Sequence, residues 1–235
     1  MIGLERVDYR DRETALTGCL ARPEGTPRAA VLVFPTIMNP TPAVEAKARA
    51  LATSGYLALI ADFYGEPVGD FPTAVRLAAD LRGDVEGYRT RLRAALSALE
   101  QLSDGLPRAA IGFCMGGQAV LELTRENAAL EVVASFHGLL DTGRKAPAGG
   151  PVSPRILVCH GDADALVPRA QVTAFWEEMD AAGADWHFHS YARVGHGFTN
   201  PQASPAGGPS SYNASADRQS WAAMLGLFDE IFTGG

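Results

Sequence analysis

Residues 109–117 read AAIGFCMGG, an apolar run that passes directly into a cysteine flanked by glycines. A continuous apolar run is typical of a strand that is covered on both faces of a sheet. The residues that follow, Met115 to Arg125, have apolar side chains at helical spacing. The stretch therefore predicts a sharp strand–turn–helix connection with Cys114 at the turn.

This turn is typical of a nucleophile elbow, the G-x-S-x-G pattern, here with cysteine in place of serine. Glycine is expected at 112 and 116 because a Cβ at either position would crowd so tight a turn. The helix dipole favours a thiolate at Cys114, and the Met115 N–H would point at a developing oxyanion. The alternative is that Cys114 is a small core residue, as free cysteines often are.

Elsewhere the chain alternates apolar runs with stretches of helical spacing, which predicts βαβ units and a mostly parallel sheet with helices on both faces. Strands are expected at Ala29–Phe34, Tyr56–Ile60, Ala109–Phe113, Val132–Phe136, Ile156–Cys159 and Trp186–Tyr191. Helices are expected at Ala43–Thr53, Asp84–Leu102, Pro168–Ala182 and Ala216–Phe232. Two stretches, Leu4–Tyr9 and Ala15–Ala21, flank the polar segment Arg10–Thr14 and predict an antiparallel N-terminal hairpin. We expect one α/β domain over residues 1–235, with surface loops at Gly143–Pro154 and Pro201–Ser211.

Composition narrows the class of protein. The net charge of −7 argues against nucleic acid or an anionic membrane as a partner, since both attract clustered Lys and Arg. Three scattered cysteines suggest neither a disulfide framework nor a metal site. The N-terminus lacks the apolar core of a signal peptide, and no apolar stretch approaches the roughly 18 residues of a membrane helix. We expect a cytoplasmic protein without a metal or organic cofactor.

A cysteine nucleophile needs a base, which in this arrangement follows it in the chain. His196 lies between two glycines just beyond the last predicted strand, where loop residues with chemical roles are common. His187 and His189 fall within that strand and are expected to be surface or packed residues. His160 ends a strand and is expected to be buried, whereas His137 follows one and could line a pocket.

Spacing alone leaves two candidates for the group that orients the base. The strand Ile156–Cys159 is followed by two carboxylates, Asp162 and Asp164, and then by a helix that starts near Pro168. Either aspartate could orient the histidine, and either could instead cap the helix. Asp164 is nearer the helix, so capping is the stronger alternative for it.

These residues together resemble the dienelactone hydrolase family of α/β-hydrolases. The matching pieces are GFCMGG at Gly112–Gly117, GDADALVP at Gly161–Pro168, GHGF at Gly195–Phe198 and DFYG at Asp62–Gly65. The resemblance implies an α/β-hydrolase fold and a triad of Cys114, Asp164 and His196. It places a second oxyanion N–H at Ile37, beside that of Met115, and implies a small ester or lactone as substrate. Thr36, Tyr64, His137, Phe198 and Asn200 are then expected to line the pocket.

Three positions depart from the family pattern. Thr36 stands where dienelactone hydrolase has a glutamate that restrains its cysteine. Asn200, and Gly65 with Glu66, stand where it has arginines that hold the substrate carboxylate. We therefore expect a thiol that is reactive without substrate, and a neutral ester or lactone, or an acid anchored in another way. Arg193 is a substitute anchor or, more simply, a solvated arginine.

The sequence thus predicts hydrolysis through an acyl-thioester. One rival is an acyltransferase or cysteine peptidase on the same fold. Transfer of the acyl group to an added nucleophile, or cleavage of peptides, would favour this rival. Another is a non-catalytic binding protein, against which the intact set of triad residues argues.

Overall fold

The computed structural model describes residues 2–203 and 211–232. The chain divides into two compact units, Met1–Ala110 and Ile111–Gly235, and each is described by itself. The boundary falls within one strand, β5 (Arg108–Phe113). The single domain expected over residues 1–235 stays a prediction.

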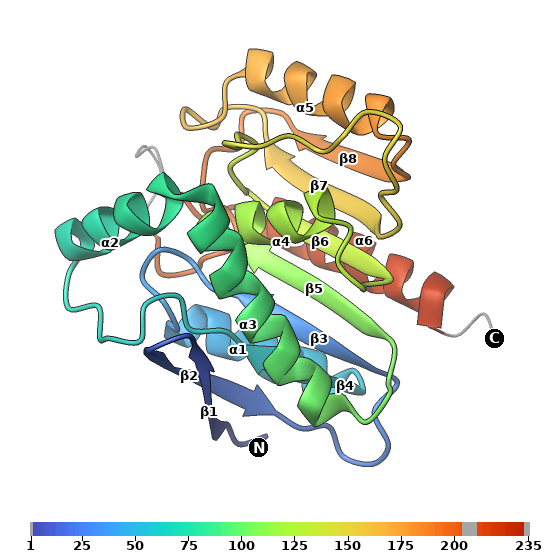
Figure 1. The fold of residues 1–235 in the computed structure, drawn as a ribbon. Helices are drawn as coiled ribbons and strands as arrows, with labels where there is room; N and C mark the ends of the chain where they lie inside the picture. Colours follow the sequence, from blue (N-terminus) through green and yellow to red (C-terminus); the bar gives the residue numbers. More distant parts are fainter. Residues whose placement is uncertain (1, 204–210, 233–235) are drawn as a thin grey trace. The chain divides into compact units, whose positions relative to one another are not determined.

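The first unit is a mixed sheet with helices packed on it (Figure 1). Its strands, in sheet order, are β1 (Glu5–Asp11), β2 (Thr14–Ala21), β4 (Tyr56–Ile60) and β3 (Ala29–Phe34). The pairs β1–β2 and β2–β4 are antiparallel, whereas β3–β4 is parallel. Helix α1 (Pro42–Thr53) packs on β2 and β4, and α3 (Val85–Ser103) packs on β1 and β3 from the other face.

Two local differences from the expected elements have clear causes. The hairpin strands extend further than predicted, because Asp11 pairs with Thr14 and leaves only Arg12 and Glu13 in the turn. An additional helix, α2 (Phe71–Gly83), begins at an Asp70 cap that accepts from Thr73 N–H (2.8 Å). Its buried side chains are Ala74, Leu77 and Ala78.

The second unit is a parallel sheet with helices on both faces. Strands β6 (Val132–Phe136), β7 (Arg155–Gly161) and β8 (Trp186–Tyr191) pair in that order. Helices α4 (Met115–Arg125) and α6 (Ala214–Phe232) both pack against β6 and lie on opposite faces in Figure 1. Helix α5 (Arg169–Ala181) follows β7. The α/β fold and the antiparallel N-terminal hairpin are therefore confirmed.

A buried ionic cluster fixes the loop after β6. Arg125, with a fully buried side chain, pairs with Glu178 (2.8 Å) and Glu122 (2.9 Å). It also donates to Leu140 O (2.8 Å) in that loop. Because both buried carboxylates pair with the one guanidinium, the cluster ties α4, α5 and the loop together.

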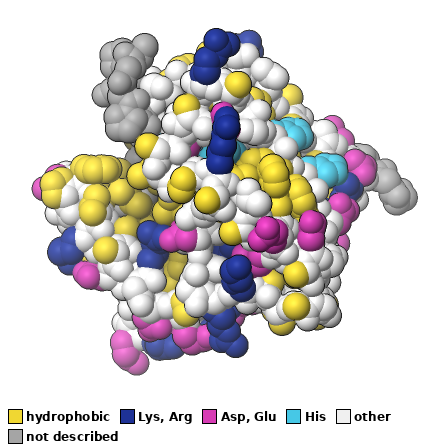
Figure 2. Space-filling view, turned by 90° about the horizontal axis from the view of Figure 1, so that it is seen from above, with side chains coloured by type: hydrophobic (Ala, Val, Ile, Leu, Met, Phe, Trp, Pro, Cys, Tyr) yellow, Lys and Arg dark blue, Asp and Glu magenta, His cyan; other side chains and the backbone are white. Residues whose placement is uncertain are grey.

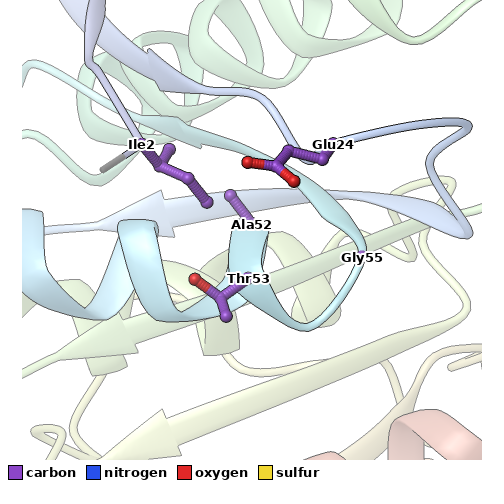
Figure 3. Close-up of a pocket in the computed structure, with 5 residues that line it drawn as sticks. All are labelled: Ile2, Glu24, Ala52, Thr53 and Gly55. Atoms are coloured by element: carbon purple, nitrogen blue, oxygen red, sulfur yellow. The ribbon is translucent and has the colours of Figure 1, made fainter.

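The surface of the described residues is chemically mixed. On the face seen in Figure 2, Lys and Arg side chains are scattered among acidic and apolar ones rather than gathered in one patch. A pocket of about 320 Å³ in the first unit is lined by Ile2, Glu24, Ala52, Thr53 and Gly55 (Figure 3), none of which is a predicted site residue. In the described part of the chain, every helix is too short or too polar to span a bilayer.

The predicted surface loops are only partly described. Gly143–Pro154 runs between β6 and β7 as expected, with its backbone held at Ala146 N–H by Glu178 (2.9 Å). Much of Pro201–Ser211 lies outside the described residues.

Candidate active site

Cys114 lies where β5 turns into α4, with a half-buried side chain and a strained backbone. Its φ of 57° and ψ of −118° are rare for a residue with a Cβ, a conformation that costs about 1–3 kcal/mol and needs support from its surroundings. A Cβ at Gly112 would overlap the backbone of Gly116, so the close approach of strand and helix requires glycine there. The predicted strand–turn–helix connection with Cys114 at the turn is present, and its role as a nucleophile stays a prediction.

Main-chain hydrogen bonds continue past the strand ends and join the segments that carry the candidate residues. We call these three bonds the strand-end ladder: Cys114 N–H to Phe136 O (3.1 Å), His137 N–H to Cys159 O (2.8 Å) and Asp162 N–H to Tyr191 O (3.0 Å). Ligand and catalytic groups in such sheets collect at the carboxyl ends of the strands. The ladder sets these ends in register.

Asp164 and His196 meet in the interior of the second unit. His196 Nδ1 lies 2.7 Å from Asp164 Oδ2, and the side chains are 7% and 0% exposed. The other carboxylate oxygen accepts from Leu166 N–H (2.9 Å). Asp164 therefore holds the imidazole by Nδ1 and does not cap α5, whose N-cap is Pro168.

The second ring nitrogen of His196, Nε2, lies on the side of the ring away from Asp164. This nitrogen is buried and makes no hydrogen bond of regular geometry among the described residues, although the Cys114 sulfur is near enough to act on its pKa. Burial lowers the pKa of His196, but the hydrogen bond with Asp164 and the nearby sulfur of Cys114 outweigh it and raise the pKa to about 10. The site thus favours an imidazolium beside the cysteine.

The other aspartate and histidines that the sequence offered for these roles lie in other surroundings. Asp162 makes a two-pronged salt bridge with Arg169 (2.9 and 2.6 Å) at the surface. His187 and His189 are exposed on β8, as expected of surface residues. His160 is 2% exposed, and burial lowers its pKa.

His137 is buried among the site residues rather than open to a ligand. It is 2% exposed, its Nδ1 accepts from Cys114 N–H (3.1 Å), and its Nε2 lies 2.8 Å from Thr199 Oγ1. Its ring packs edge-on against those of His196 (5.1 Å between centroids) and Phe198 (5.2 Å). The contact with Thr199 was not foreseen, because nothing in the sequence links residues 62 positions apart.

The remaining residues that were predicted to line the pocket in the second unit lie in the loop after β8. Phe198 is fully buried, and its backbone carbonyl accepts from Asn213 N–H (3.1 Å). Asn200 is half-buried, and its side-chain oxygen accepts from Gln202 N–H (3.0 Å). Arg193 is exposed. Their roles in binding stay predictions.

Three predicted residues belong to the first unit. Thr36 and Ile37 follow β3 and are half-buried, and Tyr64 follows β4. Tyr64 Oη donates to Ile37 O (3.1 Å). This bond uses the carbonyl of Ile37 and not the N–H, for which the oxyanion role is predicted. Thr36 Oγ1 accepts from Met38 N–H (3.2 Å), so this short loop is held by its own side chain.

The loop is anchored by a buried carboxylate of the DFYG stretch. Asp62 accepts from Asn39 Nδ2 (2.7 Å), Tyr64 N–H (2.9 Å) and Gly65 N–H (3.0 Å). The stretch that carries part of the resemblance therefore has a structural role, tying the segment after β3 to the segment after β4.

A family model described as the dienelactone hydrolase family matches residues 16–232. The chain belongs to the dienelactone hydrolase family. Membership makes it a dienelactone hydrolase-like hydrolase, and it confirms the family that the sequence motifs indicated. A relative in Bradyrhizobium sp, named "Probable 2-oxo-3-(5-oxofuran-2-ylidene)propanoate lactonase", is 28% identical over 84% of each chain.

Solved structures of the dienelactone hydrolase type agree in fold. The structure called m3DLH is 34% identical, covers 98% of this chain and 99% of its own, and has a TM-score of 0.91. The dienelactone hydrolase-like promiscuous phosphotriesterase P91, from metagenomic libraries, is 35% identical over 98% of each chain, with a TM-score of 0.90.

Proposed function

We propose that this chain hydrolyses a carboxylic ester or lactone with Cys114 as nucleophile, His196 as base and Asp164 as the residue that orients the base. One observation carries the proposal: His196 is buried with Nδ1 on Asp164 at 2.7 Å, while Nε2 makes no hydrogen bond of regular geometry in the described residues. A buried polar atom without a partner is costly unless another group uses it. The neighbouring sulfur and the substrate are the groups that would.

In this mechanism, transfer of the Cys114 proton to His196 Nε2 gives the thiolate–imidazolium pair that the raised pKa of His196 favours, and the sulfur attacks the substrate carbonyl carbon. The backbone N–H groups of Met115 and Ile37 are proposed to hold the oxyanion. The tetrahedral intermediate expels the alcohol, which takes the proton from His196 and leaves an acyl-thioester. Water then gives a proton to His196, attacks the thioester and releases the acid, and Cys114 recovers its proton.

The electrostatics of His196 suit both halves of this cycle. The sulfur is one of the groups that raise the pKa of His196, and acylation removes the charge that a thiolate has. The pKa of His196 therefore falls in the acyl-enzyme, where a neutral imidazole is needed to take a proton from water. Asp164 keeps Nε2 directed at the reaction in both halves.

The nucleophile is tested with p-nitrophenyl acetate and three proteins: wild type, Cys114→Ala and the matched control Cys19→Ala. We expect turnover to be lost in the first variant and kept in the second. Iodoacetamide should label Cys114 first. Cys19 and Cys159 both have pKa values raised by burial, that of Cys159 to about 12. Equal turnover by Cys114→Ala and wild type contradicts the proposal.

We further propose that neutral substrates are preferred over those with a carboxylate. Gly65, Glu66 and Asn200 supply no positive charge where the family resemblance places arginines. The test compares two esters with acyl chains of similar length: p-nitrophenyl butyrate, which is neutral, and the p-nitrophenyl monoester of succinate, which has a carboxylate. Faster turnover of the charged ester contradicts the preference.

The likeness to P91 favours a second candidate, hydrolysis of neutral phosphate triesters. The sulfur would attack phosphorus and expel the phenol, and water would then cleave the phosphoryl–sulfur bond. Paraoxon tests this activity in the same three proteins. Release of nitrophenol that does not depend on Cys114 contradicts it.

A further inference from the structure

His137 has both of its ring nitrogens engaged, although the proposed mechanism assigns it no step. Nδ1 lies 3.1 Å from the backbone nitrogen of Cys114, and Nε2 lies 2.8 Å from Thr199 Oγ1. The side chain is 2% exposed, and its own backbone has a φ of 42°. A residue held this firmly in an unfavourable conformation calls for a physical reason.

The contacts fix the protonation state of the ring. The Cys114 N–H is shared between Phe136 O and Nδ1 of His137, each at 3.1 Å. Because a backbone N–H can only donate, Nδ1 accepts its share and is unprotonated. Nε2 then has the ring's proton and donates to the Thr199 hydroxyl oxygen. A doubly protonated ring would direct one N–H at another. The arrangement therefore selects the neutral Nε2–H form.

These two bonds join the two sides of the proposed catalytic pair. One holds the backbone of Cys114, and the other holds Thr199, three residues after His196. The ring of His137 also packs edge-on against the ring of His196, with centroids 5.1 Å apart and planes at 71°. One side chain at the end of β6 thus contacts the elbow, the loop of the base and the base itself.

We propose that His137 is a positioning residue that sets the separation of Cys114 and His196 through its neutral ring. The proposal rests on the proposed function, in which Cys114 and His196 act as a pair. The Nδ1 acceptor holds the strained backbone of Cys114, and the Nε2–H donor holds the loop that contains the base. A catalytic pair needs such support, because small displacements of the reacting groups cost large factors in rate.

Three variants separate positioning from simple packing. His137→Phe keeps an aromatic ring but removes the side-chain acceptor of Cys114 N–H, which retains only Phe136 O. His137→Asn is smaller but places a side-chain oxygen near the position of Nδ1, and so keeps that acceptor. Thr199→Val removes the partner of Nε2 with little change of volume. His189→Phe, on the exposed face of β8, is the matched control.

The readout is the rate of Cys114 alkylation by iodoacetamide, which needs no substrate, measured with kcat and KM for p-nitrophenyl acetate. Loss of one hydrogen bond corresponds to roughly a five- to tenfold change. We expect His137→Phe to slow alkylation and lower kcat by about tenfold or more with little change in KM. His137→Asn should recover most of both rates despite its poorer packing, and Thr199→Val should fall between.

Thermal unfolding of each variant shows whether it is folded, and Thr199→Val keeps the test open if His137→Phe does not fold. Wild-type alkylation in His137→Phe or in Thr199→Val overturns the proposal. Equal losses in His137→Asn and His137→Phe overturn it too, since the acceptor would then be irrelevant. If wild type cleaves no ester but the alkylation rates follow the expected order, the proposed function fails and the positioning role stands.

Discussion

Replacing Asp164 by asparagine tests how the imidazole of His196 is held. The rise in the pKa of His196 from 6.5 to about 10 corresponds to roughly 5 kcal/mol of preference for the imidazolium, at about 1.4 kcal/mol for each pKa unit. Asp164 and Cys114 both contribute to this preference, against the opposing effect of burial. Losing a buried hydrogen bond to a charged group costs roughly 2–3 kcal/mol, or about 30- to 150-fold in rate.

The tautomer adds to this loss. An asparagine amide can donate to Nδ1 and so leave the proton of a neutral ring on Nε2, where the thiol needs an acceptor. We therefore expect kcat/KM for p-nitrophenyl acetate near neutral pH to fall by at least about 30-fold. The assay compares Asp164→Asn with Asp162→Asn, which breaks only an exposed salt bridge and should change the rate little.

Two results would refute the reasoning. One is an Asp164→Asn enzyme within about threefold of wild type. The other is a larger loss in Asp162→Asn than in Asp164→Asn, which would give the orienting role to the residue that the structure places in a salt bridge with Arg169. Circular dichroism of both variants shows that any loss is not unfolding.

Three further outcomes follow from the structure. Alkylating Cys114 with iodoacetamide should lower the pKa of His196 in an NMR titration, because the sulfur can no longer have a charge; an unchanged pKa speaks against the coupling. Gly112→Ala should lower the free energy of unfolding, measured in urea, by several kcal/mol. Gly226→Ala in α6, where nothing lies within 4 Å of the added Cβ, should raise it by about 1 kcal/mol. Similar values for the two variants contradict the tight-turn argument. Arg125→Met should cost about 3–5 kcal/mol by leaving buried carboxylates without their partner, and a neutral effect in the same assay contradicts it.

The pH dependence of stability has a definite sign. The folded pKa of His196 is above its ordinary value of 6.5, so its contribution to stability is fully present below about pH 6.5. It is lost as the pH rises through about 10. The difference in unfolding free energy between wild type and His196→Gln should therefore shrink over this range, and a difference that grows contradicts the assigned shift.

The sequence was most informative where apolar residues run without interruption. Strands β3, β4 and β6 have the bounds that their apolar runs predict, since burial on both faces leaves little room for polar side chains. Strand β8 also has its predicted bounds, but from the alternation of half-buried and exposed side chains. Helix α2 was missed because Phe71 and Val75 are exposed and its buried face is mostly alanine. The Asp70 cap followed by Pro72 was the available signal.

The candidate site was predictable only in part for a similar reason. Chain order and flanking glycines single out Cys114 and His196, because their surroundings are local in sequence. The choice between Asp162 and Asp164 depends on which carboxylate turns inward, and spacing cannot decide that. The contacts of His137 and of Arg125 depend on segments that only folding brings together.

The strand-end ladder has a consequence for how this enzyme could change. Its bonds are made by main-chain atoms, so these contacts of Cys114, His137 and the Asp162 segment do not depend on which side chains those positions have, whereas the added contact of the His137 ring with Cys114 N–H does. A new nucleophile, such as serine at position 114, would be delivered to the same point. The side chain at position 114 can therefore be replaced while the main-chain bonds of the strand-end ladder that position it are kept.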